Sequence, residues 1–455
     1  MGLFETVLHE HLQIIERKKE ITMKSLKVAI IGAGSTYTPE LIDGFLQRLN
    51  SLSLGSLYFM DINLPKTRIV ASLCQRMLDD KGVTAPIIIT DNLELAIEGA
   101  DYVLGQVRVG MLEARIRDEK IPLKYNLLGQ ETTGAGGFMK ALRTIPVIMN
   151  VAKTMERLAP DAWLINFSNP SGIIAETILN HSSVKMMGLC NGPIGMIREA
   201  KNKLPEDTKE FDYDFVGLNH LCWLTGIYAD GVEILQKHLG RADSSQIGAT
   251  SFKNIPESPY SPELLQVMKG IPIGYLNYYY FRDESVKKCQ NAEKTRGEVC
   301  VGIEDELLRL YQDTSIKEKP DVLNQRGGAL YSEAAVSLID AIENDKNEVH
   351  VVDVKNNGTY PFLAYDDVVE TKCVINKDGA TPIPLRNYHN THITGLVQAV
   401  KAYEKLTVKA GLEGDRTAAL SALLVHPLIG DYNRAKPLLD EMLEANKMYL
   451  PQFFK

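Results

Sequence analysis

The chain has 455 residues, of which 45% are hydrophobic, enough to bury a sizeable core in two closely packed domains. Its formal net charge of −8 argues against nucleic acid as the main partner, and no apolar run reaches the roughly eighteen residues that a transmembrane helix needs. Six scattered cysteines without CxxC pairing, and a start without a recognisable signal peptide, lead us to expect a reduced, cytoplasmic protein.

A glycine-rich turn follows the first predicted strand. That strand covers residues 26–31 and runs into Gly32 and Gly34, and a helix is predicted to open near Pro39, a residue suited to a first helical turn. Glycines at such a junction allow a tight turn and bring backbone amides close to a pyrophosphate. The pattern departs from the dinucleotide fingerprint at its third glycine, where this chain has Tyr37.

An acidic residue ends the second predicted strand, 57–60. Asp61 can accept hydrogen bonds from the adenosine ribose, although it lies further downstream than the usual spacing of about 20 residues. Its negative charge would repel the 2′-phosphate of NADP, which favours NAD. We therefore predict an NAD site formed by Gly32, Gly34, Ser35, Thr36 and Asp61.

Strands continue to alternate with helices through about residue 110, which is typical of an α/β fold. We predict a Rossmann-like dinucleotide-binding domain over residues 26–195. Residues 196–455 are expected to form an interleaved α+β domain with the substrate, metal and subunit contacts. Residues 1–25 are predicted to be an N-terminal extension, to which we assign no function.

Two polar stretches precede the middle of the chain. Residues 108–119 contain Arg115, and their simplest interpretation is a solvated helix face, although an anionic substrate would need an arginine fork. Residues 129–137 are glycine-rich but lack the preceding strand and the closing Lys-Ser/Thr of a P-loop. We expect a flexible loop that carries Glu131 over the crevice.

Three apolar stretches in the middle of the chain each read as a short buried strand that ends in a polar cluster. The clusters contain Asn169, Cys190 with Asn191, and His220. Ligands bind beyond the carboxyl ends of strands in open α/β sheets, so these three ends are expected to converge on one crevice. A lone buried cysteine or histidine is usually structural, but a thiolate beside an imidazole suits a divalent transition metal.

In this combination the chain resembles glycoside hydrolase family 4, the NAD- and manganese-dependent phospho-glycosidases. The resembling segments are 32–41, 129–132, 169–170, 190–191, 219–220 and the tyrosines from residue 275 onward, and the similarity covers about residues 26–445. The resemblance implies a fold similar to lactate and malate dehydrogenases. It also implies NAD and Mn²⁺, or another divalent metal, as cofactors, and a homodimer or homotetramer.

The resemblance further implies roles for individual side chains. These roles are metal binding by Cys190 and His220, binding of sugar hydroxyls and phosphate by Arg115, Asn169 and Arg296, and catalysis by Tyr275, Glu131 and Asn191. Tyr275 would be the base, and Glu131 would modulate its basicity. The aromatic cluster at 275–280 has a simpler explanation as helix packing or a subunit contact.

The chemistry implied by the resemblance differs from the two-carboxylate mechanism of most glycosidases. Hydride leaves carbon 3 for NAD, the base removes the proton at carbon 2, the aglycone is eliminated, water adds and the hydride returns. In α-acting relatives an aspartate follows the metal-binding cysteine and acts as the general acid. Asn191 cannot donate an acidic proton, which resembles the β-acting branch. We therefore expect hydrolysis of 6-phospho-β-glucosides such as phosphorylated cellobiose.

Other functions stay open at this point. The chain could be a 6-phospho-α-glucosidase or another family 4 glycosidase. It could also be a simple NAD-dependent hydroxy-acid dehydrogenase, which would accumulate NADH. A non-catalytic sensor of NAD or sugar phosphate would leave Cys190, His220 and Tyr275 without a purpose.

Overall fold

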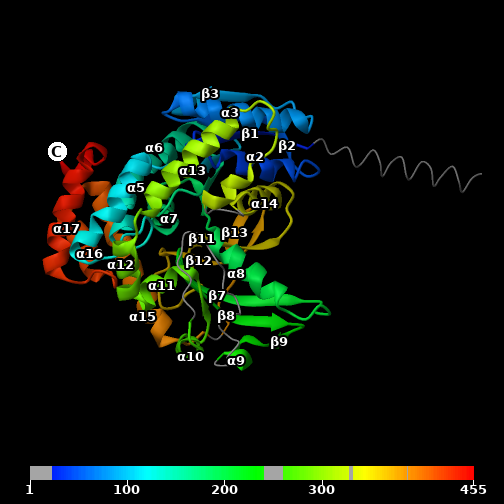
Figure 1. Cartoon of the computed structure of the whole chain (residues 1–455). Helices are drawn as coiled ribbons and strands as arrows, with labels where there is room; N and C mark the ends of the chain where they lie inside the picture. The colour runs from blue at the N-terminus through cyan, green and yellow to red at the C-terminus, as the bar shows by residue number, and fades with distance from the viewer. Residues whose placement is uncertain (1–22, 240–259, 327–330, 387) are drawn as a thin grey trace, which may run out of the picture.

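The computed structural model describes residues 23–239, 260–326, 331–386 and 388–455. Within these residues one large sheet crosses the middle of the molecule (Figure 1). Its strands are β1 (Ser25–Ile31), β2 (Ser53–Met60), β3 (Ile87–Thr90), β4 (Tyr102–Gly105), β5 (Trp163–Asn166), β6 (Lys185–Gly188), β11 (Glu348–Lys355), β12 (Val368–Asn376) and β13 (Gly379–Pro382). They lie in the order β13-β12-β11-β6-β5-β4-β1-β2-β3.

The strands from β3 to β6 are parallel and follow the order 3-2-1-4-5-6 of dinucleotide-binding folds. The run of apolar residues in β1 explains why this sheet is covered on both sides. Ala29 and Ile31 belong to one hydrophobic cluster, whereas Val28 and Ile30 belong to another. Because successive side chains of a strand point to opposite faces, both faces of β1 must be buried by other elements.

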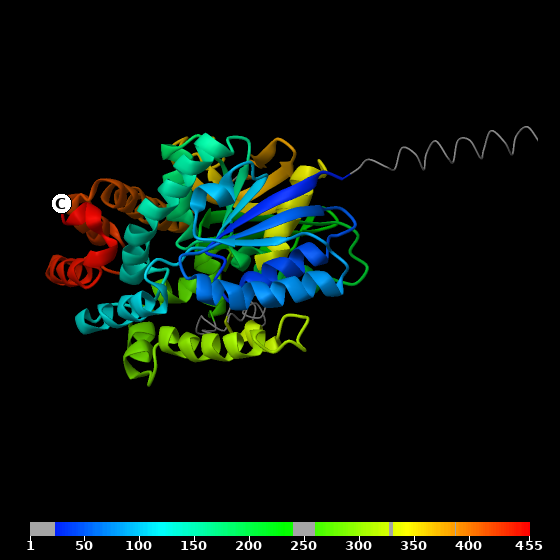
Figure 2. The same ribbon diagram turned by 90° about the horizontal axis from the view of Figure 1, so that it is seen from above.

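Helices cover the two faces of the sheet (Figure 2). One face is covered by α2 (Thr38–Leu46), α3 (Leu64–Asp80) and α14 (Tyr331–Glu343), and α13 (Arg296–Tyr311) packs on the outer side of α3. The other face packs against α4 (Leu93–Ile97), α6 (Gly134–Leu158), α7 (Ser171–His181) and α15 (Thr391–Glu413). Elements from the C-terminal half of the chain therefore pack on both faces of the N-terminal sheet.

A second, antiparallel sheet carries the third predicted strand end. It contains β7 (Phe211–Leu218), β8 (Leu221–Ala229), β9 (Val232–Glu233) and β10 (Ile271–Pro272). We expected the three polar strand ends to come from one open sheet, but β7 pairs with β8 and packs against β12 of the large sheet. His220 therefore reaches the site from a different sheet than Asn169 and Cys190.

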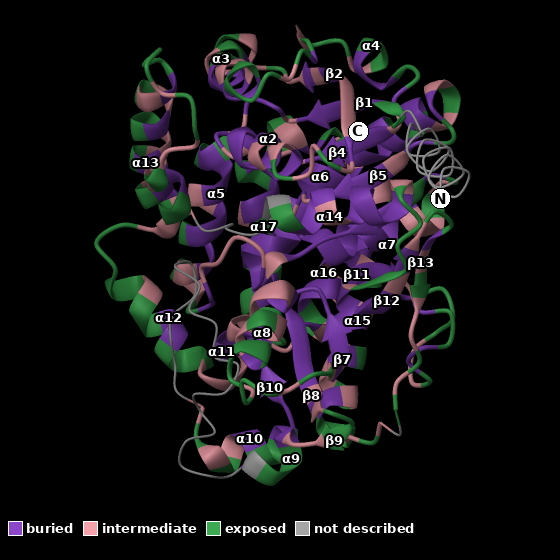
Figure 3. Cartoon of the chain, turned by 90° about the vertical axis from the view of Figure 1, so that its right-hand side faces the viewer, coloured by how far each residue is buried: buried purple, intermediate pink, exposed green. Residues whose placement is uncertain are grey.

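Strands β11, β12 and β13 add an antiparallel extension to the large sheet next to β6. This arrangement interleaves the two halves of the chain, and the domain boundary placed at residue 195 stays a prediction. The buried residues concentrate along β4, β5, β11 and the helices beside them (Figure 3).

The remaining helices complete the molecule. They are α5 (Met111–Lys120), η1 (Pro122–Tyr125), α8 (Asn191–Asn202), α9 (Leu235–His238), α10 (Pro262–Met268), η3 (Gly274–Leu276), α11 (Asn277–Tyr280), α12 (Arg282–Asn291), η4 (Asp321–Arg326), α16 (Arg416–Val425), α17 (Tyr432–Ala445), η5 (Lys447–Tyr449) and η6 (Pro451–Phe453). Among the described residues, every helix is too short or too polar to cross a membrane.

Candidate active site

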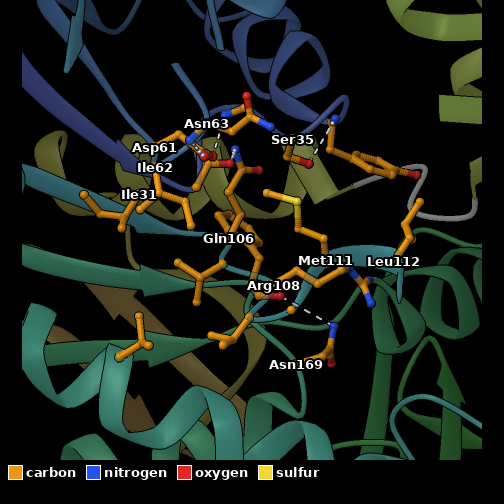
Figure 4. A pocket seen from close by; sticks show the side chains of 18 of the residues that line it. Ile31, Ser35, Asp61, Ile62, Asn63, Gln106, Arg108, Met111, Leu112 and Asn169 are labelled. Carbon is orange, nitrogen blue, oxygen red and sulfur yellow. Dashed lines mark hydrogen bonds between the residues drawn. The ribbon is translucent and has the colours of Figure 1, made fainter. Parts of the chain in front are cut away.

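One continuous cavity of about 780 Å³ runs along the carboxyl ends of the parallel strands. Ser35 and Asp61 lie at one end and Asn169 at the other, with Arg108 between them (Figure 4). The lining contains most of the predicted site residues, namely Gly32, Gly34, Ser35, Asp61, Arg115, Glu131, Asn169, Asn191 and Tyr275. The volume falls in the range of about 300–1,000 Å³ that is usual for ligand sites.

The glycine turn at the first end is shaped by close backbone packing. Gly32 has a φ of +90°, and a Cβ there would lie 2.8 Å from the Gln106 carbonyl oxygen. The Gly34 amide donates to Asp61 Oδ2 at 2.9 Å, and a Cβ on Gly34 would lie 2.9 Å from the same oxygen. Only glycine fits these positions without displacement of the neighbours. The second oxygen of Asp61 accepts from the Asn63 amide at 2.9 Å, which holds the carboxylate at the cavity wall.

Thr36 is buried beneath this turn. Its hydroxyl accepts a hydrogen bond from Arg326 Nη1 at 2.9 Å, and its carbonyl accepts from the Tyr311 hydroxyl at 2.7 Å. Arg326 also pairs with Glu304 at 2.7 Å and lines the cavity. The sequence reasoning missed Arg326, because its contact with the turn spans 290 residues of chain.

The charged stretch predicted as a solvated face is instead partly buried. Arg115 of α5 is 5% exposed, and Asp118 and Glu119 are also buried. Arg115 Nε donates to Glu119 at 2.8 Å, and its Nη1 pairs with Glu131 at 2.9 Å. The interpretation as a solvated surface was wrong because α13 packs against α5 and covers this face.

Glu131 is held by cations from three positions in the chain. Its carboxylate pairs with Arg108, with Arg115, and with Lys140 at 3.1 Å. Burial alone would raise the pKa of the Glu131 carboxyl, but these cations outweigh it and hold the pKa well below its usual value. Glu131 is therefore anionic and fixed in place. Residues 134–137, expected within a flexible loop, form the start of α6.

Arg108 and Lys140 were missed by the sequence reasoning. Burial, together with the charge of Arg108, lowers the pKa of the Lys140 ammonium to about 7, and Glu131 opposes the shift. A signal for Lys140 was present, because it is a single charged residue in the apolar run 134–142. A buried lysine in such a run needs an anionic partner.

The two predicted metal ligands follow strands of different sheets, β6 for Cys190 and β7 for His220. Cys190 is the N-cap of α8, where its Sγ accepts from the Gly192 amide at 3.3 Å. His220 adopts a φ of +63° in the turn between β7 and β8. Burial raises the pKa of the Cys190 thiol, and the side chain of Asn219, the residue before His220, lies close enough to oppose this shift, so the two loops are neighbours.

The imidazole of His220 is buried and neutral. Burial, helped by the charge of Lys140, lowers the pKa of its imidazole to about 3. Its Nδ1 is buried without a partner among the described residues, and the same is true of Asn169 Oδ1. The imidazole stacks on the Tyr275 ring with 3.8 Å between ring centroids and 11° between the ring planes.

These donors fit a divalent metal. A soft sulfur, a neutral imidazole and an amide oxygen suit a transition metal ion. Within the described residues, no group of three or more His, Cys, Asp or Glu side chains could hold a metal on its own. A metal bound by Cys190 and His220 would therefore keep open positions for substrate oxygens or water, as catalytic metal sites do.

Arg296 is not among the described residues that line the cavity, but the next residue, Gly297, donates its amide to Glu119 Oε2 at 2.7 Å. Arg296 is the first residue of α13, and its Nη2 donates to the Gln325 carbonyl at 2.6 Å. Its predicted phosphate contact stays a prediction.

Two family models match the chain. The model described as family 4 glycosyl hydrolase covers residues 27–206, and the model for the C-terminal domain of the same family covers residues 215–429. Together they span most of the sequence. The chain belongs to glycosyl hydrolase family 4.

Relatives in this family match almost the whole chain. A protein of Bacillus subtilis (strain 168) named probable 6-phospho-beta-glucosidase is 41% identical over 95% of this chain and 98% of its own length. The 6-phospho-beta-glucosidase of Escherichia coli (strain K12) is 39% identical over 94% of this chain and 97% of its own length.

Solved structures of family 4 agree with the fold. The 6-phospho-beta glucosidase of Thermotoga maritima, solved with NAD and glucose-6-phosphate, has a TM-score of 0.85 and 34% identity. This match covers 94% of the present chain and 99% of the Thermotoga chain. Another structure of that protein contains manganese, NAD⁺ and glucose-6-phosphate, with a TM-score of 0.83 over 93% of this chain and 98% of its own. The predicted α/β fold with a Rossmann-like sheet is confirmed.

Proposed function

We propose that this protein hydrolyses 6-phospho-β-glucosides, such as phosphorylated cellobiose, with NAD and a divalent metal as cofactors. One observation carries the proposal: a single cavity joins the glycine turn and Asp61 to Asn169, Asn191 and Tyr275, and Cys190 directly precedes Asn191. A dinucleotide at one end would thus face a sugar at the other. A simple hydroxy-acid dehydrogenase has no use for the cysteine–histidine end.

The choice of β- over α-glucosides rests on Asn191 and on the relatives. Asn191 lines the cavity as the first residue of α8, and its amide cannot supply an acidic proton to a leaving group. The relatives at 41% and 39% identity are named 6-phospho-beta-glucosidases, whereas α-acting relatives match at about 30%. Both lines of support favour the β-acting branch.

The two ends of the cavity would bind different cofactors. When bound, NAD supplies reversible hydride acceptance at carbon 3, and the metal supplies Lewis-acid polarisation of the oxygens near the reacting carbons. Cys190 and His220 would hold the metal, and Asn169 would orient the sugar. Tyr275 would take the proton from carbon 2, a role that requires a nearby cation to stabilise the tyrosinate. Its stacking on His220 places it next to the proposed metal site.

The substrate phosphate would bind at the cations around Glu131. The side chain of Arg108 is 30% exposed, whereas that of Arg115 is 6% exposed, so Arg108 is the more accessible of the two. Both line the cavity, and arginine donors match a phosphate in geometry and charge. We therefore add Arg108 to the phosphate contacts proposed for Arg115 and Arg296.

The proposal is tested with nitrophenyl α- and β-glucoside 6-phosphates, with NAD and Mn²⁺ omitted in turn. We expect cleavage of the β-substrate only when both cofactors are present, without accumulation of NADH. Cleavage that continues after complete removal of NAD would reject the mechanism, and preference for the α-substrate would reject the proposed stereochemistry. Steady formation of NADH from a hydroxy acid would favour the dehydrogenase.

Replacing Arg108 with Ala should weaken phosphorylated substrates selectively. A hydrogen bond from a charged donor contributes about 1.5–3 kcal/mol, so KM for the β-glucoside 6-phosphate should rise about 10- to 150-fold. KM and kcat are measured for phosphorylated and neutral glucosides in parallel. Lys120→Ala, which removes an exposed cation at the end of α5, is the control and should leave KM and kcat unchanged for both substrates. Equal losses on both substrates would contradict the phosphate role.

Arg296→Ala tests another proposed phosphate contact in the same assay. In the structure the guanidinium of Arg296 donates to the Gln325 carbonyl. A selective loss on the phosphorylated substrate would support its proposed phosphate contact. We also propose a cytoplasmic location, since a phosphorylated sugar is an intracellular type of substrate and none of the six cysteines, all of which lie in the described residues, forms a disulfide. A homodimer or homotetramer stays a prediction.

A further inference from the structure

Two buried carboxylates lie next to each other behind the proposed metal site. Asp353 of β11 and Glu370 of β12 are directly opposite in the antiparallel register, and each residue is 1% exposed. Directly opposite side chains in such a pair lie on the same face of the sheet. Because burying two neighbouring carboxylates is unfavourable, their hydrogen-bond partners indicate what the pair holds in place.

Glu370 holds the loop that carries His220. Its Oε1 accepts from Asn219 Nδ2 at 3.1 Å, its Oε2 has no hydrogen-bond partner among the described residues, and the carboxyl group lies next to the Cys222 thiol. Asn219 precedes His220 and Cys222 follows it by two residues, so the two contacts enclose the ligand. The left-handed φ of His220 is uncommon outside glycine and needs such support from its surroundings.

The backbone of Glu370 is fixed to the same loop. The Tyr360 hydroxyl donates to the Glu370 carbonyl at 2.8 Å and accepts from the Gly217 amide at 3.0 Å. This tyrosine therefore links β12 of the large sheet to β7 of the second sheet. β12 and β7 lie side by side in the middle of the molecule (Figure 1).

Asp353 holds the loops that carry Asn169 and Cys190. Its Oδ2 accepts from Ser171 Oγ at 2.6 Å, two residues after Asn169. β11 pairs with β6 at Gly188, two residues before Cys190. The fit there is close, because a Cβ on Gly188 would lie 2.8 Å from both the Asp353 Cβ and Ser171 Oγ.

We propose that Glu370 and Asp353 are positioning residues for the metal site. They hold the ligand loops, which come from two different sheets, in one fixed geometry. This inference rests on the proposed metal-dependent function. The connection runs through Asn219, whose side chain donates to Glu370 at 3.1 Å and lies beside the Cys190 thiol. Outer hydrogen-bond partners of this kind typically change metal affinity by about 10- to 100-fold.

Neighbouring buried acids have a different partner. Glu176 and Glu404 both pair with Lys401, at 2.8 Å and 2.5 Å, and so join α7 to α15. Asp353 and Glu370 instead accept hydrogen bonds from a hydroxyl and a side-chain amide of the ligand loops. The position of the carboxylate pair therefore matters for the ligands and not only for helix packing.

The test is calorimetric titration of Mn²⁺ into the wild-type protein and its variants, with NAD binding measured separately. Glu370→Ala should weaken Mn²⁺ binding by about 10- to 100-fold and leave the NAD affinity unchanged. Glu370→Gln keeps an acceptor for Asn219 and should recover most of the affinity. Asp340→Ala is the matched control, because Asp340 is a buried acid of α14 that pairs with Lys346, and it should lower stability without changing Mn²⁺ binding.

Asn219→Ala keeps the test informative if Glu370→Ala fails to fold. It should weaken Mn²⁺ binding by a similar factor. The double variant Asn219→Ala with Glu370→Gln should bind Mn²⁺ no more weakly than Asn219→Ala alone, because both changes act on the same Asn219–Glu370 contact. Wild-type affinity in Glu370→Ala or Asn219→Ala, or an equal loss in Asp340→Ala, would overturn the inference. Failure of the wild-type protein to bind Mn²⁺ would instead overturn the proposed function on which the inference rests.

Discussion

Replacing Cys190 with Ala should abolish high-affinity metal binding and lower kcat/KM by about three orders of magnitude. The variant removes the sulfur donor at the N-terminus of α8, and His220 alone does not make a metal site. Lewis-acid stabilisation is worth several kcal/mol, and each 1.4 kcal/mol corresponds to a factor of ten in rate. Mn²⁺ affinity is measured by titration and activity with a nitrophenyl β-glucoside 6-phosphate.

The control for this variant is Cys74→Ala, which removes another buried thiol. Cys74 lies in α3, in the hydrophobic cluster on one face of the large sheet. This change should cost some stability and leave metal affinity unchanged. NAD binding should survive in both variants, because the glycine turn is at the other end of the cavity. Unchanged Mn²⁺ affinity in Cys190→Ala would reject the metal-ligand role of this residue.

Replacing Tyr275 with Phe should slow turnover by about 10²- to 10⁴-fold, the usual contribution of a positioned acid–base group. The substitution keeps the aromatic ring, so the stacking on His220 should persist while the hydroxyl is lost. Hydride transfer to NAD precedes proton abstraction in the proposed sequence. We therefore expect transient NADH formation to persist in the variant, while exchange of the carbon 2 proton with D₂O falls together with kcat.

Tyr278→Phe is the matched control, since Tyr278 is a buried neighbour whose ring lies 6.4 Å from that of Tyr275. It should retain both proton exchange and hydrolysis. If Tyr275→Phe exchanged the proton at the wild-type rate, Tyr275 would not be the base, and the aromatic cluster would be a packing feature. If both variants lost exchange equally, the effect would be structural.

Much of the fold could be read from local patterns. The apolar run 26–31 predicted the first strand, and it forms β1 (Ser25–Ile31). The assignment of residues 215–218 to the same open sheet was wrong, because strand pairing depends on partners distant in the chain. β7 pairs with β8 across a tight turn, which an isolated apolar run does not reveal.

Some residues of the site could be predicted from the sequence, and others could not. Residues directly after strands, such as Asn169, could be placed because their position follows from the strand before them. Arg108 and Lys140 could not, because their role depends on the burial of Glu131, which only packing decides. The misjudged exposure of Arg115 has the same cause, since α13 covers it from a distant part of the chain.

The sequence by itself determined the family and the strand-to-helix turn at Gly32, and it identified Cys190 and His220 as candidate ligands. These features follow from local backbone sterics and from the chemistry of single side chains. Only the tertiary structure decided that Glu370 and Asp353 stand behind the ligand loops and that Arg326 reaches the glycine turn. Such contacts join residues far apart in the chain. They form because burying a charged or polar group is unfavourable unless it has a hydrogen-bonding or oppositely charged partner.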